Sequence, residues 1–166
     1  MHMTNPISVG LGEIVISKNP EDVLVAYGLG SCLGISMIDP ANRVAGLLHA
    51  VLPDTLNGSE NETSASGKYI DHGIENLLSL ITQAGANRNR LAIRMAGGAN
   101  MLTSPGLKST FDIGTRNIEK ARAIFQKLNL KLTAEEVGGN KGRTVRVYVA
   151  ENRVTFKVIG EKEQDL

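Results

Sequence analysis

The sequence is poor in cysteine and in aromatic residues, and neither sign of charge is in excess. One cysteine cannot form an internal disulfide, which excludes a disulfide-rich secreted scaffold. Three Tyr, three Phe and no Trp offer little material for the base-stacking surfaces of single-strand nucleic-acid binders. The 18 Lys and Arg against 17 Asp and Glu give a formal net charge of +1, so we expect no nucleic-acid partner.

Long apolar runs are missing as well. The longest, residues 44–52, is interrupted by His49 and falls far short of the roughly 20 apolar residues that a membrane-spanning helix needs. Near the N-terminus, Glu13 and Lys18 stand where the apolar core of a secretion signal would lie. We therefore expect a cytoplasmic protein without membrane insertion.

What is present is the composition of an ordinary globular domain. The chain has 166 residues, of which 42% are hydrophobic and 21% are charged, and this length fits one hydrophobic core. No internal repeat or second domain is visible. We interpret residues 1–160 as one domain and residues 161–166 as a polar C-terminal tail.

Strands are predicted toward both ends of the chain, with helices between them. Alternating or β-branched segments predict strands at 7–16, 23–26, 33–38, 44–51 and 91–95, and two or three more within 130–159. Apolar stripes on one face predict helices over 69–84, ended by Gly85, and around 118–128. Residues 53–67 have the polar composition of a surface loop. The class is α/β or α+β.

The glycine-rich segment 28–34 allows three interpretations of its cysteine. A phosphate-binding loop needs a helix after the glycines, but strand-like residues 35–38 follow instead. A buried structural Cys32 is common, because a free cysteine packs like a small apolar residue. In the third interpretation Cys32 is a nucleophile at a strand end, and backbone N–H groups of this turn, including those of Gly30 and Ser31, face an oxyanion.

A nucleophilic cysteine needs a basic partner, since a thiol at its ordinary pKa is only a few per cent thiolate at neutral pH. His49 interrupts an apolar strand, which fits either a hydrogen-bonded core histidine or a catalytic base. The turn after Asp39 favours an antiparallel hairpin that pairs Asp39 with about Val44 and brings Cys32 near 49–51. His72, beside the stripe of the first helix, is expected to be an exposed surface residue.

Several blocks of the sequence resemble the CheD family of chemoreceptor glutamine deamidases. The more specific part of the likeness is Gly28-Leu29-Gly30-Ser31-Cys32 together with Leu48-His49-Ala50-Val51-Leu52-Pro53. Weaker blocks follow in the family's order at 68–71, 96–101, 113–117 and 138–143. The likeness spans nearly the whole chain.

The resemblance implies an α/β fold in three layers, with mixed and antiparallel sheets and two main helices, similar to the deamidating domain of cytotoxic necrotising toxins. It implies a single catalytic domain that deamidates specific glutamines of methyl-accepting chemotaxis receptors to glutamate, releasing ammonia, without a metal or organic cofactor. Cys32 matches the family nucleophile and His49 its base. The implied partners are receptor cytoplasmic helices and, in many organisms, the CheC-type phosphatase.

Two features of the family likeness leave alternatives open. Some members have a Thr hydroxyl where this chain has Ala26, so a backbone carbonyl or another side chain orients His49, or the enzyme is slow. The second hypothesis is therefore a non-enzymatic adaptor that binds receptors and the CheC-type phosphatase and regulates its activity. Met101 and Leu102 are expected either to contact a helical partner from an exposed loop or to pack into the core.

Overall fold

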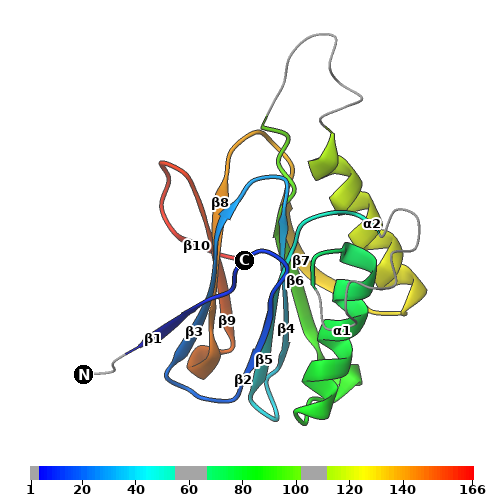
Figure 1. The fold of residues 1–166 in the computed structure, drawn as a ribbon. Helices are drawn as coiled ribbons and strands as arrows, with labels where there is room; N and C mark the ends of the chain where they lie inside the picture. Colours follow the sequence, from blue (N-terminus) through cyan, green and yellow to red (C-terminus); the bar gives the residue numbers. More distant parts are fainter. Residues whose placement is uncertain (1–3, 55–66, 102–111) are drawn as a thin grey trace.

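The chain folds into three layers, two β-sheets and a pair of helices (Figure 1). A computed structural model describes residues 4–54, 67–101 and 112–166. The strands of the first sheet are, in spatial order, β1 (Asn5–Ser8), β3 (Asp22–Leu29), β8 (Arg143–Tyr148), β9 (Arg153–Val158) and β10 (Gln164–Asp165). Those of the second are β2 (Ile14–Ser17), β5 (Val44–Ala50), β4 (Leu33–Asp39), β6 (Ala92–Gly97) and β7 (Leu132–Val137).

The two helices, α1 (Ile70–Gln83) and α2 (Ile113–Lys127), lie on the outer face of the second sheet (Figure 1). Both sheets are mixed, because β1 runs parallel to β3 and β7 runs parallel to β6 while the other neighbours are antiparallel. The predicted α/β arrangement in three layers with two main helices is therefore confirmed.

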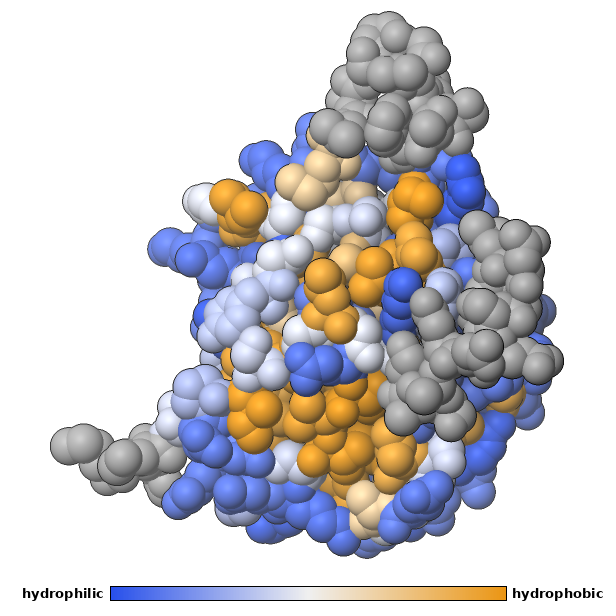
Figure 2. All heavy atoms as spheres, viewed as in Figure 1, coloured by the Kyte–Doolittle hydropathy of each residue, from blue (hydrophilic) through white to orange (hydrophobic). Residues whose placement is uncertain are grey.

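Alternation along the strands divides the apolar side chains into two cores. Leu33, Ile35 and Met37 of β4 face the helices, whereas Cys32 and Ile38 face the first sheet. The central strands β4 and β5 are buried along their whole length, which explains their nearly continuous apolar sequence. On the face shown in Figure 2, apolar residues gather along the line between the two sheets and hydrophilic residues cover the flanks.

Three predicted segments differ from the structure in their bounds. The segment 7–16 contains parts of two strands in different sheets, because a turn at Gly10–Glu13, with Gly12 at a φ of 76°, redirects the chain. The second helix begins at Ile113, earlier than its apolar stripe indicated. Within the polar segment 161–166, Gln164 and Asp165 form β10, an edge strand on β9. Most of the predicted loop 53–67 lies outside the described residues.

No helix among the described residues is both long enough and apolar enough to cross a membrane. Gly85, which follows the C-cap residue Ala84 of α1, has a φ of 111° and ends the helix as predicted.

The turn between β4 and β5 is held by a buried carboxylate. Asp39 accepts hydrogen bonds from the N–H groups of Ala41, Asn42 and Asn87 and from the guanidinium of Arg90, at 3.2 and 3.1 Å. Burial alone would raise the pKa of Asp39, but the hydrogen bonds and the charge of Arg90 outweigh burial and lower this pKa. The carboxylate thus ties the hairpin turn to the connection between α1 and β6.

We expect acid to weaken the fold through Asp39. Its pKa in the folded state lies below the unfolded value of about 4, so the carboxylate stabilises the fold above that pH, and this contribution is lost as the pH falls through the folded pKa. Asp39→Asn should lower the free energy of unfolding by about 2–4 kcal/mol at neutral pH. Urea unfolding between neutral pH and about pH 3 should also show a flatter acid dependence for this variant.

The matched control is Asp165→Asn, which removes an exposed carboxylate that pairs with Arg153. It should change the free energy of unfolding by at most about 0.5 kcal/mol. An Asp39→Asn variant with the stability and acid dependence of the unmodified protein would contradict the anchoring role.

Candidate active site

Cys32 lies where the chain passes from the first sheet to the second. β3 ends at Leu29 in one sheet and β4 begins at Leu33 in the other, so three residues make the whole connection. A strand follows these glycines, and this connection therefore lacks the helix N-terminus that a phosphate-binding loop requires. The side chain of Cys32 faces the space between the sheets and is 9% exposed.

His49 lies on the neighbouring strand and on the same face. The register pairs Asp39 with Val44 and Gly34 with His49, which confirms the predicted hairpin. Cys32 precedes Gly34 by two residues, so alternation makes it the diagonal neighbour of His49. Diagonal neighbours have Cα atoms roughly 7–8 Å apart, a separation that a long side chain such as imidazole bridges. The hairpin therefore brings the predicted pair together, with only a glycine between them on that face.

The imidazole of His49 is oriented by the main chain. Its Nδ1 lies 2.9 Å from the carbonyl oxygen of Val9, a buried residue directly after β1. A carbonyl only accepts hydrogen bonds, so we assign a proton to Nδ1, and in the neutral form of the ring the lone pair is then on Nε2. Val9 is held in turn by its own N–H, which donates to the carbonyl of Val25 on β3 at 2.7 Å.

This carbonyl supplies the orientation that Ala26 cannot. Ala26 is fully buried on β3, and Tyr27, next along the strand, points to the outer surface, where its ring lies against Arg146. Of the two orienting groups that the sequence left open, a backbone carbonyl and another side chain, the geometry favours the carbonyl; the alternative of a slow enzyme is untouched by it. The sequence does not reveal which carbonyl this is, because every residue type carries the same main-chain oxygen.

The second nitrogen of His49 is available for chemistry. Nε2 is buried and has no hydrogen-bond partner in the described part of the chain. Hydrogen bonds between catalytic groups are often long or unmade before substrate binds. The main chain thus holds Nδ1, and Nε2 lies on the cysteine's side of the sheet.

The carbonyl groups around Cys32 are all fixed from outside the turn. Those of Gly30 and Cys32 accept from the N–H groups of Ala99 and Gly98, at 2.8 and 2.9 Å. The Ser31 carbonyl accepts from Nδ2 of Asn117 on α2, at 2.9 Å. Within the described residues, the N–H groups of Gly30, Ser31 and Cys32 have no backbone acceptor. The predicted oxyanion donors Gly30 and Ser31 require N–H groups that are not already bonded to another main-chain oxygen, as is the case here.

Cys32 opens into a pocket of about 370 Å³. Its described lining is mostly apolar and comes from three segments, namely Gly28, Gly30, Ser31, Cys32, Ala99, Met101 and Ile113. Met101 is 54% exposed and its sulfur lies close to Gly30, so this side chain is not packed into the core. Leu102, predicted beside it as a partner contact, lies outside the described residues. The volume and apolar character suit a small side chain.

The cysteine is not activated by its surroundings alone. Burial raises the pKa of the Cys32 thiol above its ordinary value, and the residue's own N–H, which faces the sulfur, lowers it only in part. At neutral pH the thiol is therefore protonated. Forming the thiolate depends on a base, and Nε2 of His49 is the buried nitrogen that the hairpin provides.

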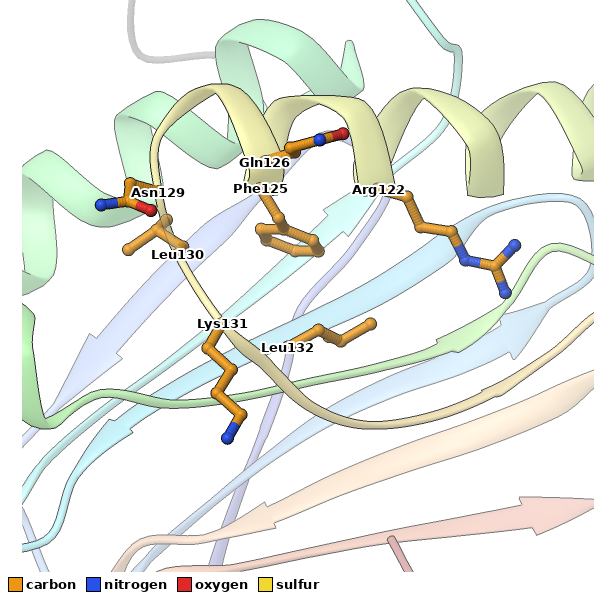
Figure 3. Close-up of a pocket in the computed structure, with 7 residues that line it drawn as sticks. All are labelled: Arg122, Phe125, Gln126, Asn129, Leu130, Lys131 and Leu132. Carbon is orange, nitrogen blue, oxygen red and sulfur yellow. The ribbon is translucent and has the colours of Figure 1, made fainter.

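Other parts of the described structure offer less chemistry. His72 is exposed on α1, in agreement with its interpretation as a surface residue. A second pocket, of about 360 Å³, lies between the C-terminal end of α2 and β7, with Phe125 and Leu132 facing each other across it (Figure 3). It contains no cysteine or histidine. The described residues contain no group of three or more His, Cys, Asp or Glu side chains that could hold a metal ion.

Two glycines let the backbone segments of the site approach one another. A Cβ on Gly97, which has a φ of 117°, would lie 2.2 Å from the carbonyl oxygen of Cys32. A Cβ on Gly114, in the first turn of α2, would lie 2.4 and 2.5 Å from the carbonyl oxygens of Gly98 and Ala99. Real Cβ atoms are not found at such distances, so α2 rests directly on the main chain that lines the pocket.

Comparisons with known proteins bear on this site. Residues 51–158 match the family model described as CheD chemotactic sensory transduction, well over half of the chain. The chain belongs to the CheD family. A relative from Symbiobacterium thermophilum, named probable chemoreceptor glutamine deamidase CheD, is 42% identical over 159 residues, which cover 96% of this chain and 96% of the relative.

Other CheD relatives come from distant organisms. One from Pyrococcus abyssi, with the same name, is 39% identical over 160 residues and covers 95% of both chains. One from Thermotoga maritima, named chemoreceptor glutamine deamidase CheD, is 36% identical over 156 residues and covers 94% of both chains. The family resemblance inferred from the motifs is thereby confirmed over nearly the full length.

In this CheD-family chain, we expect Gly114→Ala to damage both the fold and the site. The new methyl group would push α2 away from the Gly98–Ala99 main chain and lower the free energy of unfolding by about 1–3 kcal/mol. Alanine is the better helix former by about 1 kcal/mol, so a net loss would identify the clash. Urea unfolding measures the loss.

Gly142→Ala is the control, because the nearest atom to its Cβ would be the flexible end of Ile159 at 3.1 Å, and the Leu29 carbonyl oxygen lies at an ordinary contact distance of 3.7 Å. A Gly114→Ala variant that equals or exceeds the unmodified protein in stability would show that the two segments are not in tight contact.

Proposed function

We propose that this chain is a chemoreceptor glutamine deamidase that converts specific receptor glutamines to glutamate and releases ammonia. The observation that carries the proposal is the pairing of Cys32, which lines a pocket, with His49, whose Nδ1 is held by the Val9 carbonyl and whose Nε2 has no hydrogen-bond partner among the described residues. Membership of the CheD family and the names of the relatives support it. A receptor's cytoplasmic helices are the proposed substrate, and the cytoplasm is the expected site of action.

In the proposed first half-reaction, Nε2 of His49 takes the thiol proton of Cys32. The thiolate attacks the carboxamide carbon of the glutamine side chain, and the carbonyl oxygen becomes an oxyanion that faces the backbone N–H groups of the Gly30–Cys32 turn. The tetrahedral intermediate collapses when the imidazolium of His49 gives its proton to the departing nitrogen. Ammonia leaves, and the substrate stays attached to Cys32 as a thioester.

The second half-reaction uses the same groups with water. Nε2 of His49 removes a proton from a water molecule, which attacks the thioester carbon. A second oxyanion forms on the same side and collapses, and the Cys32 thiolate leaves and takes back the proton from His49. The product is a glutamate side chain. Because the carbonyl of Val9 keeps the proton on Nδ1, the ring presents the same nitrogen in both halves.

We expect Cys32→Ala to abolish ammonia release from a receptor cytoplasmic fragment. His49→Gln should lower the rate about 10²–10⁴-fold, the usual contribution of a general base. The measurement is ammonia release, with mass spectrometry of the fragment to count amide-to-acid conversions.

His72→Gln is the matched control, because it removes an exposed histidine on α1 and should leave the rate unchanged. Full activity in Cys32→Ala would refute the nucleophile assignment.

We further propose that Met101 contacts the receptor helix. Its side chain is 54% exposed at the rim of the Cys32 pocket and would add apolar contact beside the bound glutamine. Met101→Ala should raise the KM for the receptor fragment about tenfold, equivalent to ~1.4 kcal/mol, with a smaller effect on kcat.

Leu80→Ala provides the comparison, since Leu80 is an exposed apolar residue on α1, outside the pocket. Equal KM values for the Met101 and Leu80 variants would exclude the proposed contact.

A second candidate function is regulation without catalysis, in which the chain binds receptors and the CheC-type phosphatase. Burial of Cys32 and its raised pKa favour this candidate, because a thiol that stays protonated is a poor nucleophile. Receptor fragments left unmodified by the unaltered protein, together with tight binding of a CheC-type phosphatase, would support the adaptor and exclude the deamidase.

A further inference from the structure

One buried amide joins the two chain segments that carry Cys32 and His49. Asn117 lies on α2 with no exposed surface, and its Nδ2 donates to the carbonyl oxygens of Ser31 and Val51, each at 2.9 Å. Ser31 directly precedes Cys32, and Val51 follows His49 by two residues. A single side chain therefore ties the cysteine turn to the end of β5.

The bond to Ser31 also fixes the direction of the next N–H. A trans peptide is planar, so the carbonyl of Ser31 and the N–H of Cys32 point in opposite directions. With the carbonyl held toward Asn117, the N–H of Cys32 faces the other way. That N–H faces the Cys32 sulfur, where it favours the thiolate. Loss of the bond would free this peptide to rotate and to turn a carbonyl toward the developing negative charge.

Asn117 differs from the other anchors of the turn. The carbonyls of Gly30 and Cys32 are held by main-chain N–H groups, whereas Ser31 is held by a side chain. Its Oδ1 is buried and has no hydrogen-bond partner within the described residues, which is a cost to folding. Ile113, one helical turn earlier on α2, lines the pocket of Cys32.

We propose that Asn117 is a positioning residue for the deamidation, which fixes the Ser31–Cys32 peptide and the spacing of Cys32 from His49. It contacts neither the substrate nor the reacting atoms. It acts by directing the Cys32 N–H toward the sulfur and toward the oxyanion that forms beside it. The predicted effect of Asn117 on catalysis rests on the proposed function. Its predicted effect on the reactivity of the Cys32 thiol does not depend on that function.

Two variants test the role of Asn117. Asn117→Ala removes both hydrogen bonds, and Asn117→Asp keeps the shape but loses the N–H donors. Both should lower kcat for ammonia release about 10²-fold, the usual effect of losing one oxyanion donor, with little change in KM. If the Ala variant does not fold, Asn117→Leu decides the question, because it keeps a similar side-chain volume without N–H donors and without placing a buried charge against two carbonyl oxygens.

Thiol reactivity gives a readout that needs no substrate. Cys32 is the single cysteine, so alkylation by iodoacetamide reports on it alone. The midpoint of the alkylation rate against pH should move upward in Asn117→Ala by about 0.5–1 pH unit, because the thiolate loses its facing N–H. The Asp variant is unsuitable for this profile, since its own charge would raise the thiol pKa.

Ile124→Val and Ile124→Ala serve as controls for stability. Ile124 is buried on the same helix two turns from Asn117, in the core between helix and sheet, and its truncation should weaken the fold without changing kcat or the alkylation midpoint. Unchanged kcat and midpoint in a folded Asn117→Ala would overturn the proposal. The proposal would also be overturned if an Ile124 variant of equal stability showed the same loss of kcat and the same shift of the alkylation midpoint.

The outcomes separate this proposal from the proposed function. If the unaltered protein releases no ammonia, the deamidase assignment fails, and the alkylation midpoint still decides whether Asn117 positions the thiol. If the unaltered protein is active and the Asn117 variants keep its kcat and midpoint, only the positioning role fails.

Discussion

The antiparallel register of β4 and β5 is the constraint on which the candidate site depends. It pairs seven residues of each strand, from Asp39 with Val44 to Leu33 with Ala50. Side chains alternate with a period of two, so a slip of one residue would turn His49 toward the helices. Cys32 would still face the first sheet but would have no histidine beside it. Asp39 fixes the closed end of this hairpin and Asn117 joins its open end. Both ends are therefore held by polar contacts with later parts of the chain.

Around this hairpin, the main chain supplies most of the polar contacts of the site. A carbonyl orients the imidazole, and main-chain N–H groups hold two of the three carbonyls beside Cys32. Such contacts require close approach of backbone segments, which the glycines at 97 and 114 allow. Among the described residues, burial is the main influence on the pKa of the thiol and raises it, so the histidine must supply the base.

The sequence predicts local structure and the hairpin well, because these depend on neighbouring residues. The turn after Asp39 and the apolar runs on either side of it are enough to bring Cys32 near His49. The separation of the 7–16 segment into two sheets was not predicted, since a strand-like composition does not say which partner a strand will choose. The role of Val9 depends on where β1 lies beside β3, a contact between segments that no local pattern encodes.

Asn117 is a second residue whose contacts the sequence does not predict. It stands within a block, 113–117, that contributes to the family resemblance, yet its residue type alone does not identify its partners. Its spacing of four residues from Ala121 places it on the same side of the helix as the apolar stripe. The carbonyls of Ser31 and Val51 that it meets there follow only from the packing of the helix on the Gly98–Ala99 main chain.

The Val9 carbonyl has a consequence for how such a site tolerates change. Every residue type carries the same carbonyl, so exchanging the Val9 side chain leaves the hydrogen-bond acceptor in place as long as β1 keeps its register on β3. A survey by side-chain replacement would find the cysteine and the histidine and would miss the third group. Position 26 then needs no hydroxyl to orient the histidine, and the residue type there is constrained only by packing. Orientation of the histidine then follows from strand pairing, and it would be lost through a shift of β1 rather than through any single substitution.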